Sequence, residues 1–516
     1  TQSEWYAVGG GEAGYVAVDP EDPEIVYAAD HWWLTRYDNR TKDVKWISAW
    51  PELYYGWGAA DLKYRLQWTH PVLISPHDPK ALYIGSQFVL RSTDEGNSWQ
   101  EVSPDLTRAD PDKLERAPRR GREEIEPYWG PITRDASGIE HYGTIFALAE
   151  SPIQKGVWWA GSDDGLVHVS RDDGKTWQDV TPQGLPEWAL VSILDPSPHD
   201  PATAYLAATR YKLQDNRPYL YKTNDYGTSW TKITAGIPDH DFTRVIREDP
   251  DRRGLLYTGT ETGVYVSFDD GGRWQRLQLN LPVVPVHDFV FKDGELAIAT
   301  HGRSFWIFDD AYVLRQLTPE VLAAATDLFA PRPTVRFLDN RRPAAGGLGS
   351  TPEPAGENPA SGVVFHYYLG RRPAGEVKLA ILEPSGQLVQ EFSSAGAGGP
   401  KVPAEVGTNR FEWNMLYPAP FLLEGTFFMR YRPVGPKAPP GTYQARLTVD
   451  GRTFTQSFEI VKDPRVPTTP AQFAEQHRML LAVRDRIGTI HETVGEVRRL
   501  RAQLEEIVRR AEGTPD

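Results

Sequence analysis

The sequence of 516 residues contains no cysteine. Disulfide bonds, cysteine zinc sites and thiol catalysis are therefore all excluded. It also lacks any apolar run approaching the ~18 residues of a membrane-spanning helix. Basic residues are outnumbered, with 56 Lys and Arg against 70 Asp and Glu, for a net charge of −14. An acidic surface repels phosphates, so a nucleic acid partner is not expected.

Familiar catalytic and cofactor signatures are missing as well. There is no His-Glu-x-x-His, acidic calcium loop, phosphate loop or Ser nucleophile elbow. Gly9, Gly11 and Gly14 fit the spacing of a dinucleotide-binding loop, but they precede a strand instead of opening a helix. The scattered histidines favour hydrogen-bonding roles over metal ligation. We therefore expect no cofactor and no metal ion.

What the chain does have is aromatic residues and turn formers. It contains 17 Trp, 23 Tyr, 45 Gly and 43 Pro, a composition that favours many short strands joined by turns. The length allows two to four domains.

One motif, Ser/Thr-x-Asp-x-Gly-x-x-Trp, occurs four times in the first 280 residues, and we call each copy an Asp/Gly/Trp turn. The copies span residues 92–99, 170–177, 223–230 and 267–274. In each copy, glycine supplies the positive φ of a tight turn, and aspartate can accept hydrogen bonds from the following amides. We expect the following residues to be structural: Asp94, Gly96, Trp99, Asp172, Gly174, Trp177, Asp225, Gly227, Trp230, Asp269, Gly271 and Trp274.

The motif belongs to a repeating unit of four strands in roughly 45 residues, which is typical of a β-propeller blade. Five such units lie between residues 14 and 280, and a shorter sixth spans Val286–Phe308. We therefore predict a propeller of about six to seven blades over residues 1–312. Trp5–Val8 resembles the outer strand of another blade, so either that strand closes the ring or sequence outside this chain does. For the same reason we expect a processed product or a partial chain.

The Asp/Gly/Trp turns resemble the Asp-box, or bacterial neuraminidase repeat, of sialidases, xyloglucanases and sortilin-type receptors. Longer phrases, at 68–79, 142–152 and 299–306, are similar to large bacterial exported proteins described as sortilin-like or glycosyl-hydrolase-like. The resemblance covers residues 10 to about 500. It implies a β-propeller and an extracellular or periplasmic location, and it suggests the C-terminal half of a longer protein.

Two enzyme classes can be compared with these residues. The Arg-Ile-Pro phrase that sialidases carry ahead of their boxes is absent. Xyloglucanases use two facing carboxylates, as glycoside cleavage requires. The weak candidates for such acids are Asp61, Asp135 and Glu140. Aromatic and histidine residues in the same loops could contact a sugar, namely Tyr55, Trp57, Tyr64, Trp68, Trp129 and His141. Alternatively, the aromatics fill the loops and the acids pair with Arg65 or Arg134.

Three further segments follow the predicted propeller. Residues 313–361 combine a short helix with a Pro/Gly-rich linker. About seven short strands at 362–465 predict an immunoglobulin-like β-sandwich. A long helix is expected over 468–512, where apolar residues repeat every seven positions from Leu480 and Val483, interrupted at Arg501. Such a seam requires a partner, which could be the sandwich, a second copy or another chain.

These observations favour a non-catalytic extracellular propeller that binds a protein or glycan and scaffolds an assembly through the helix at 470–511. The alternative is a glycoside hydrolase acting on a polysaccharide, with paired carboxylates at the propeller mouth.

Overall fold

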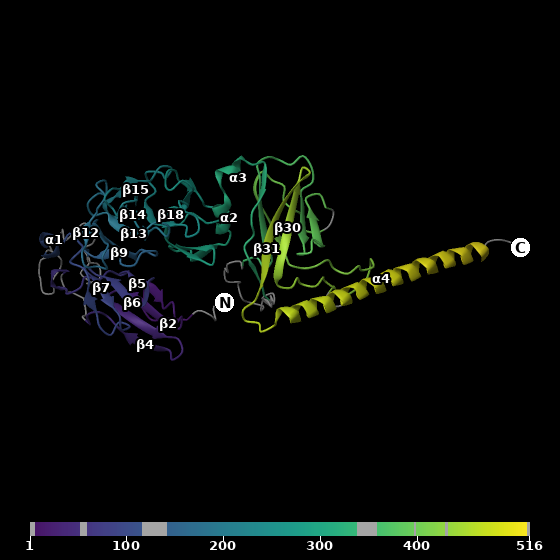
Figure 1. Cartoon of the computed structure of the whole chain (residues 1–516), viewed down its shortest axis with the longest axis horizontal. Helices are drawn as coiled ribbons and strands as arrows, with labels where there is room; N and C mark the ends of the chain where they lie inside the picture. Colours follow the sequence, from purple (N-terminus) through teal and green to yellow (C-terminus); the bar gives the residue numbers. More distant parts are fainter. Residues whose placement is uncertain are drawn as a thin grey trace, which may run out of the picture. The chain divides into compact units, whose positions relative to one another are not determined.

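The computed structural model describes residues 6–51, 59–115, 142–337, 359–396, 399–428 and 432–512. The chain divides into two compact units, Thr1–Phe308 and Asp309–Asp516 (Figure 1). The expected fold class is confirmed, because the chain is mainly β, carries several four-stranded antiparallel sheets and ends in one long helix.

The first unit is a series of antiparallel sheets in which the strand order follows the sequence, as in propeller blades. We number the described sheets as blades one to six. Their strands are β1 (Val16–Val18), β2 (Ile25–Asp30), β3 (Trp33–Asp38) and β4 (Asp43–Trp46); β5 (Val72–Ser75), β6 (Asp78–Gly85), β7 (Val89–Ser92) and β8 (Gln100–Glu101); β9 (Ile145–Glu150), β10 (Trp158–Ser162), β11 (Val167–Ser170) and β12 (Gln178–Asp179); β13 (Leu190–Pro196), β14 (Ala204–Arg210), β15 (Asp215–Thr223) and β16 (Thr231–Lys232); β17 (Thr243–Glu248), β18 (Leu256–Thr260), β19 (Val264–Ser267) and β20 (Gln275–Arg276); β21 (Val286–Lys292), β22 (Glu295–Thr300) and β23 (Phe305–Phe308).

The second strand of each of blades one to five contains a run of buried residues. In blades two to five neighbouring blades cover both of its faces, whereas in blade one the segment around Gly10 and Gly11 lies against Ala28 and Asp30. β2, β10 and β18 are buried at every position. The fourth strands of blades two to five are two-residue segments that are exposed at both positions. Blades two to five are therefore apolar in the middle and polar at their rims.

The Asp/Gly/Trp turns share most of their hydrogen bonds. The fourth copy lacks one of them, the second hydroxyl bond to its aspartate, because Arg273 stands where the other copies have Ser or Thr. In the first, the Ser92 hydroxyl donates to Asp94 at 2.8 Å and accepts from the Gly96 amide at 2.8 Å. Hydrogen bonds from the Ser98 hydroxyl and amide lower the pKa of Asp94 to about 2. The four indole N–H groups donate to backbone carbonyls of the preceding blade, at Ile47, Val102, Val180 and Ile233. These contacts are those of a turn that links one blade to the next.

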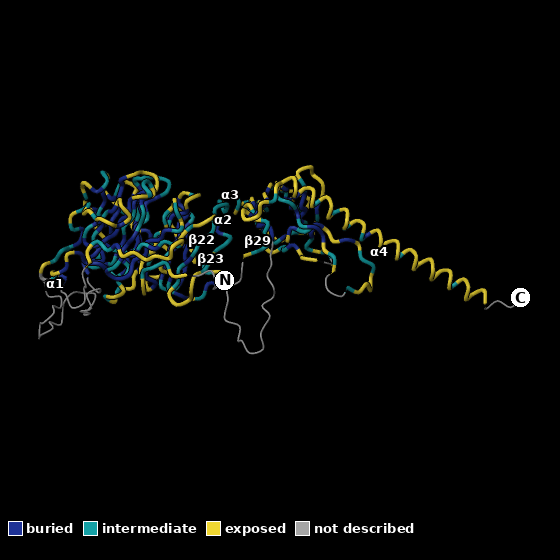
Figure 2. The backbone as a smooth tube through the Cα atoms, turned by 90° about the horizontal axis from the view of Figure 1, so that it is seen from below, coloured by how far each residue is buried: buried dark blue, intermediate teal, exposed yellow. Residues whose placement is uncertain are grey.

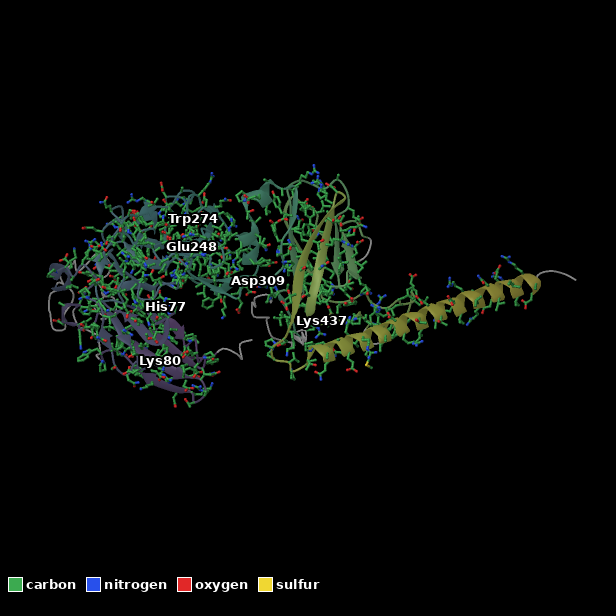
Figure 3. The ribbon with its side chains drawn as sticks, viewed as in Figure 1. His77, Lys80, Glu248, Trp274, Asp309 and Lys437 are labelled. Carbon is green, nitrogen blue, oxygen red and sulfur yellow. The ribbon has the colours of Figure 1, made fainter. Side chains whose placement is uncertain are left out.

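A second link between blades comes from the two Ser-Pro-His-Asp-Pro phrases of the sequence. The Ser75 hydroxyl of blade two donates to Glu150 of blade three at 2.5 Å, and His77 Nε2 donates to the Ser151 carbonyl at 2.8 Å. In the same arrangement the Ser197 hydroxyl of blade four donates to Glu248 of blade five, and His199 Nε2 donates to the Asp249 carbonyl at 2.8 Å (His77 and Glu248 are labelled in Figure 3). Hydrogen bonds buried between the sheets, two of them to carboxylates, thus fix the position of each blade against the next.

The connections between strands emerge at two opposite faces, because the strands of each blade alternate in direction. The Asp/Gly/Trp turns join third strands to fourth strands and lie on one face. The connections from second to third strands, such as 31–32 and 163–166, lie on the other, together with the segments that lead into the next blade. We call this second face the inter-blade face.

Blade six differs from the blades before it. In the described residues it has three strands, and its face directed away from blade five carries Val290, Phe305 and Ile307, which are 57%, 65% and 50% exposed. The register places Ile307 at the position of Val266 in blade five, which is 3% exposed. The same apolar face is therefore buried in blade five and bare in blade six.

The segment before β1 lies on blade one and does not form a fourth strand of blade six. Tyr6 contacts Tyr37 with ring centroids 6.2 Å apart, and the Gly10 amide donates to the Thr35 hydroxyl at 2.8 Å. The described residues of this segment therefore do not form the strand that was expected to close the ring.

The second unit contains two sheets that share one core. β24 (Thr326–Leu328), β26 (Val363–Leu369) and β29 (Gly407–Trp413) form the first, and β25 (Thr334–Arg336), β31 (Arg452–Lys462), β30 (Gly441–Val449), β27 (Lys378–Leu382) and β28 (Leu388–Ser393) form the second. Phe365, Leu379, Trp413 and Leu447 lie in the core between them. The result is a β-sandwich, and its immunoglobulin-like topology remains a prediction.

Helices complete the second unit. α2 (Ala311–Gln316) and α3 (Pro319–Ala323) precede the sandwich. The short helix α1 (Pro111–Glu115) belongs to the first unit instead. α4 (Pro470–Glu512) is long and mostly exposed (Figure 2). No helix within the described ranges is both long enough and apolar enough to cross a membrane.

Candidate functional site

Of the residues that the sequence grouped as a possible site, the structure describes Asp61, Tyr64 and Trp68. Asp61 is exposed at the end of a 3-10 turn, η2 (Ala59–Asp61). Tyr64 is 6% exposed, and its hydroxyl donates to Glu101 at 2.9 Å. Tyr64 therefore belongs to the core between blades one and two, whereas Trp68 is half-buried on the inter-blade face.

The other predicted site residues lie outside the described residues. They are Tyr55, Trp57, Trp129, Asp135, Glu140 and His141. Arg65, named as a possible partner for the acids, instead binds Asp105 at 2.9 Å and the Gly143 carbonyl at 2.8 Å.

A carboxylate and an imidazole that sequence reasoning missed meet at the inter-blade face of blade one. His31 Nδ1 lies 2.6 Å from Asp30 Oδ1. The two residues are 7% and 2% exposed. β2 ends at Asp30, and His31 takes a left-handed backbone conformation with φ 52°, which turns the chain into β3. Glu95, Asp173, Tyr226 and Asp270 of the Asp/Gly/Trp turns adopt the same conformation, so the positive φ of His31 marks a tight turn.

Indole rings surround this pair and continue to the surface. The His31 and Trp68 rings lie 3.7 Å apart between centroids. Trp33 contacts both Trp32 and Trp46 at 5.1 Å. Trp46 is 65% exposed. The aromatic row thus leads from a buried acid–imidazole pair to an open indole face, the kind of surface that stacks on a sugar ring. The run Asp30-His31-Trp32-Trp33 was the available sequence signal.

Gln67 and His70 flank Trp68, and Gln67 joins this segment to blade three. His70 Nδ1 lies 3.3 Å from the Gln67 carbonyl, and burial lowers the pKa of His70 to about 4, so the ring is neutral at pH 7. The Gln67 amide donates to Asp163 at 3.1 Å. The segment that carries Trp68 is therefore fixed at both ends.

A second cluster of titratable groups on the inter-blade face is the pair Asp163 and Asp164. Burial and the neighbouring Asp164 raise the pKa of Asp163 to about 7. Asp163 accepts hydrogen bonds from the Gly143 amide and from the Thr144 amide and hydroxyl, each at 2.9 Å. Both aspartates are 1% exposed. Their oxygens are occupied by protein donors, which suits a structural role better than a catalytic one.

A third charged cluster joins the inner strands of blades four to six. Arg247 lies 3.2 Å from Asp195 and 2.8 Å from Asp288. Burial raises the pKa of Asp195 to about 6, and burial beside Asp288 raises the pKa of Tyr15 to about 12. One guanidinium thus links β13, β17 and β21 near the start of β1.

Among the described residues, no group of three or more His, Asp or Glu side chains is placed to hold a metal ion. The Asp30–His31 pair is the candidate site because a row of indoles connects it to the exposed Trp46.

No family model matches the chain. Over 166 residues the chain is 26% identical to a xyloglucanase from a Paenibacillus species, and the match covers 30% of this chain and 16% of that enzyme. The chain therefore spans well under two thirds of the length of this curated relative.

Several solved structures show a weak likeness. A GH74 xyloglucanase from Xanthomonas campestris aligns with 18% identity over 57% of this chain and 44% of its own, at a TM-score of 0.37. YCF48 from Cyanidioschyzon merolae aligns with 11% identity over 57% of this chain and 81% of its own, at a TM-score of 0.38. Values this low assign no chemistry, and the propeller fold stands on the strand pairing itself.

Proposed function

We propose that this propeller belongs to a glycoside hydrolase that acts on a polysaccharide, and that the polysaccharide binds along the inter-blade face of blade one. The observation that carries the proposal is the Asp30–His31 pair beside a row of indoles that ends at the exposed Trp46. The similarity to a xyloglucanase over 166 residues supports a β-glucan such as xyloglucan as the substrate.

Asp30 is the proposed acid or base of the reaction. Glycoside hydrolysis needs two carboxyl groups on opposite sides of the scissile bond. His31, whose Nδ1 lies 2.6 Å from Asp30 Oδ1, is the proposed charge partner of this carboxylate. Asp61, exposed on the connection that also carries Trp68, is the proposed second carboxylate among the described residues. Asp135 keeps its place as a further candidate from the sequence.

A second function, glycan or protein binding without catalysis, is favoured by a different observation. Asp30 is 2% exposed, and the Ala13 amide donates to its Oδ1 at 3.3 Å. Catalysis at Asp30 therefore requires the segment around Ala13 to move away, whereas stacking of a sugar on Trp46 requires no movement.

We further propose that the Asp/Gly/Trp turns are Asp-boxes and that the protein works outside the cell or in the periplasm. The support is the Ser/Thr-to-Asp hydrogen bond that recurs in all four turns, together with the resemblance of the longer phrases to exported sortilin-like proteins.

Glycan binding is tested by electrophoresis through gels that contain xyloglucan. Trp46→Ala should weaken retardation about two- to tenfold, because stacking on an aromatic ring is worth about 0.5–1.5 kcal/mol. Phe305→Ala is the matched control, since Phe305 is also 65% exposed but lies on blade six. Equal retardation of the wild type and both variants would remove the proposed site.

A further inference from the structure

Helix α4 packs on its own sandwich with one side only. The His477 ring lies 4.5 Å from the Tyr417 ring, and the Leu423 amide lies 3.3 Å from His491 Nδ1. A Cβ added at Gly488 would meet the backbone of Phe421 at 3.5 Å. The residues on this side recur every three or four positions and end at Gly495, where an added Cβ would lie 3.2 Å from Leu423 Cδ1.

The opposite side of α4 is apolar and exposed. Val483, Ile490, Val497 and Leu504 are 47%, 54%, 59% and 62% exposed. At 3.6 residues per turn, these positions lie about 140° or more around the axis from Gly488. Contact with the sandwich and contact through this seam therefore do not compete.

The part of α4 beyond Gly495 carries the widest apolar surface. Leu500, Ile507 and Val508 are 60%, 61% and 55% exposed. These residues widen the seam of Val497 and Leu504 to the broad stripe of a helix that packs against another helix. Because most helical stability in proteins comes from tertiary packing of an apolar face, we expect this stripe to have a partner.

We propose that this end of α4 pairs antiparallel with the same segment of a second copy of the chain. With Leu480, Ile487, Val494, Arg501 and Val508 at heptad position a, the d positions are Val483, Ile490, Val497, Leu504 and Ala511. A parallel pair in register would place the two Arg501 side chains in one layer, where like charges repel.

The antiparallel arrangement removes that conflict and pairs opposite charges. When Arg501 packs against Leu504 of the partner subunit, the a/d layers also bring Val497 against Val508 of the partner subunit. The e positions then place Arg498 opposite Glu505 of the partner subunit, and the two-fold axis repeats this pair. Leu500 faces Ile507 of the partner subunit on the other flank.

This overlap uses the part of the helix that has left the sandwich. Residues 494–511 correspond to about 27 Å of helix at 1.5 Å per residue. The two sandwiches then lie at opposite ends of the overlap. The pairing rests on the helix alone and is independent of the proposed hydrolase activity, so either can fail without the other.

The test is sedimentation velocity of the intact chain from about 1 to 100 µM. One chain has a mass of 58.0 kDa, so the dimer has twice that mass. Glu505→Arg and Arg498→Glu should each weaken dimerisation about tenfold or more, since each leaves two like-charge contacts. The double variant Arg498→Glu/Glu505→Arg should restore it. Arg499→Glu, on the sandwich side of the helix, is the control with the same change in charge.

Cysteine cross-linking decides the direction, because the chain has no cysteine of its own. Differently tagged Val497→Cys and Val508→Cys chains, mixed and oxidised, should form disulfides between unlike chains. Cross-links between like chains would overturn the proposal. So would failure of the double variant to dimerise, or a wild-type chain that stays monomeric throughout the concentration range. Circular dichroism of every variant checks that α4 remains helical.

Discussion

The bare outer face of blade six leads to a prediction that needs no ligand. Val266 and Val290 lie on corresponding faces of blades five and six, yet they are 3% and 57% exposed. Val266→Ala should lower the free energy of unfolding by about 2–3 kcal/mol, from about 0.8 kcal/mol for each buried methyl plus the cavity left behind. Val290→Ala should cost less than about 1 kcal/mol.

Comparing the same substitution at two strand positions removes most of the difference in strand propensity between valine and alanine. The remaining difference, at least about 1 kcal/mol, reports burial by the next blade. Guanidinium unfolding followed by tryptophan fluorescence measures it in the propeller, because every tryptophan except Trp413 lies in residues 1–308. Equal costs at the two sites would show that the face of blade six directed away from blade five is covered. That result would refute the interpretation that no other blade packs against it.

Two further predictions concern stability. The pKa of Asp195 is raised from 3.8 to about 6 in the folded chain. Its protonated form therefore stabilises the fold fully below pH 4, and this stabilisation is lost as the pH rises through 6. The change in the free energy of unfolding is about 3 kcal/mol, at 1.36 kcal/mol per pKa unit. Asp195→Asn should flatten the unfolding free energy between pH 4 and 6, and an unchanged slope would contradict the assignment. Gly174→Ala should lower the melting temperature more than Gly302→Ala: both have φ above 80°, but only at Gly174 would the Cβ meet a backbone atom, 2.7 Å from the Val102 carbonyl oxygen. Equal shifts would show that the turn adjusts freely.

Much of the fold could be predicted because its signals are local and repeated. Each Asp/Gly/Trp turn contains its own hydrogen-bond donors and acceptors, so a single copy such as Ser92–Trp99 specifies its turn without distant residues. The long C-terminal helix was predicted for the same reason, since its heptads need only neighbouring positions. By contrast, the side of α4 that packs on the sandwich depends on Gly488 and Gly495 meeting a loop some 70 residues earlier in the chain, between Phe421 and Leu423.

The candidate site was harder to predict because it depends on long-range contacts. Asp30 and His31 are adjacent, but the ring of Trp68 comes from another connection, and nothing in the sequence indicates that it reaches His31. Tyr64 shows the converse case. It belongs to an aromatic loop that appeared suited to a ligand, but its ring is in the core and only its hydroxyl finds a polar partner, Glu101.

The central claim is that Asp30 takes part in cleaving a polysaccharide held on the inter-blade face. Release of reducing ends from xyloglucan by the wild type and by Asp30→Asn, with binding measured on the same preparations, tests it most directly. Loss of the acid or base should reduce the rate by about 100-fold or more while binding changes by less than about twofold. Xyloglucan bound by the wild type without release of reducing ends, or equal rates for the two proteins, would contradict the claim.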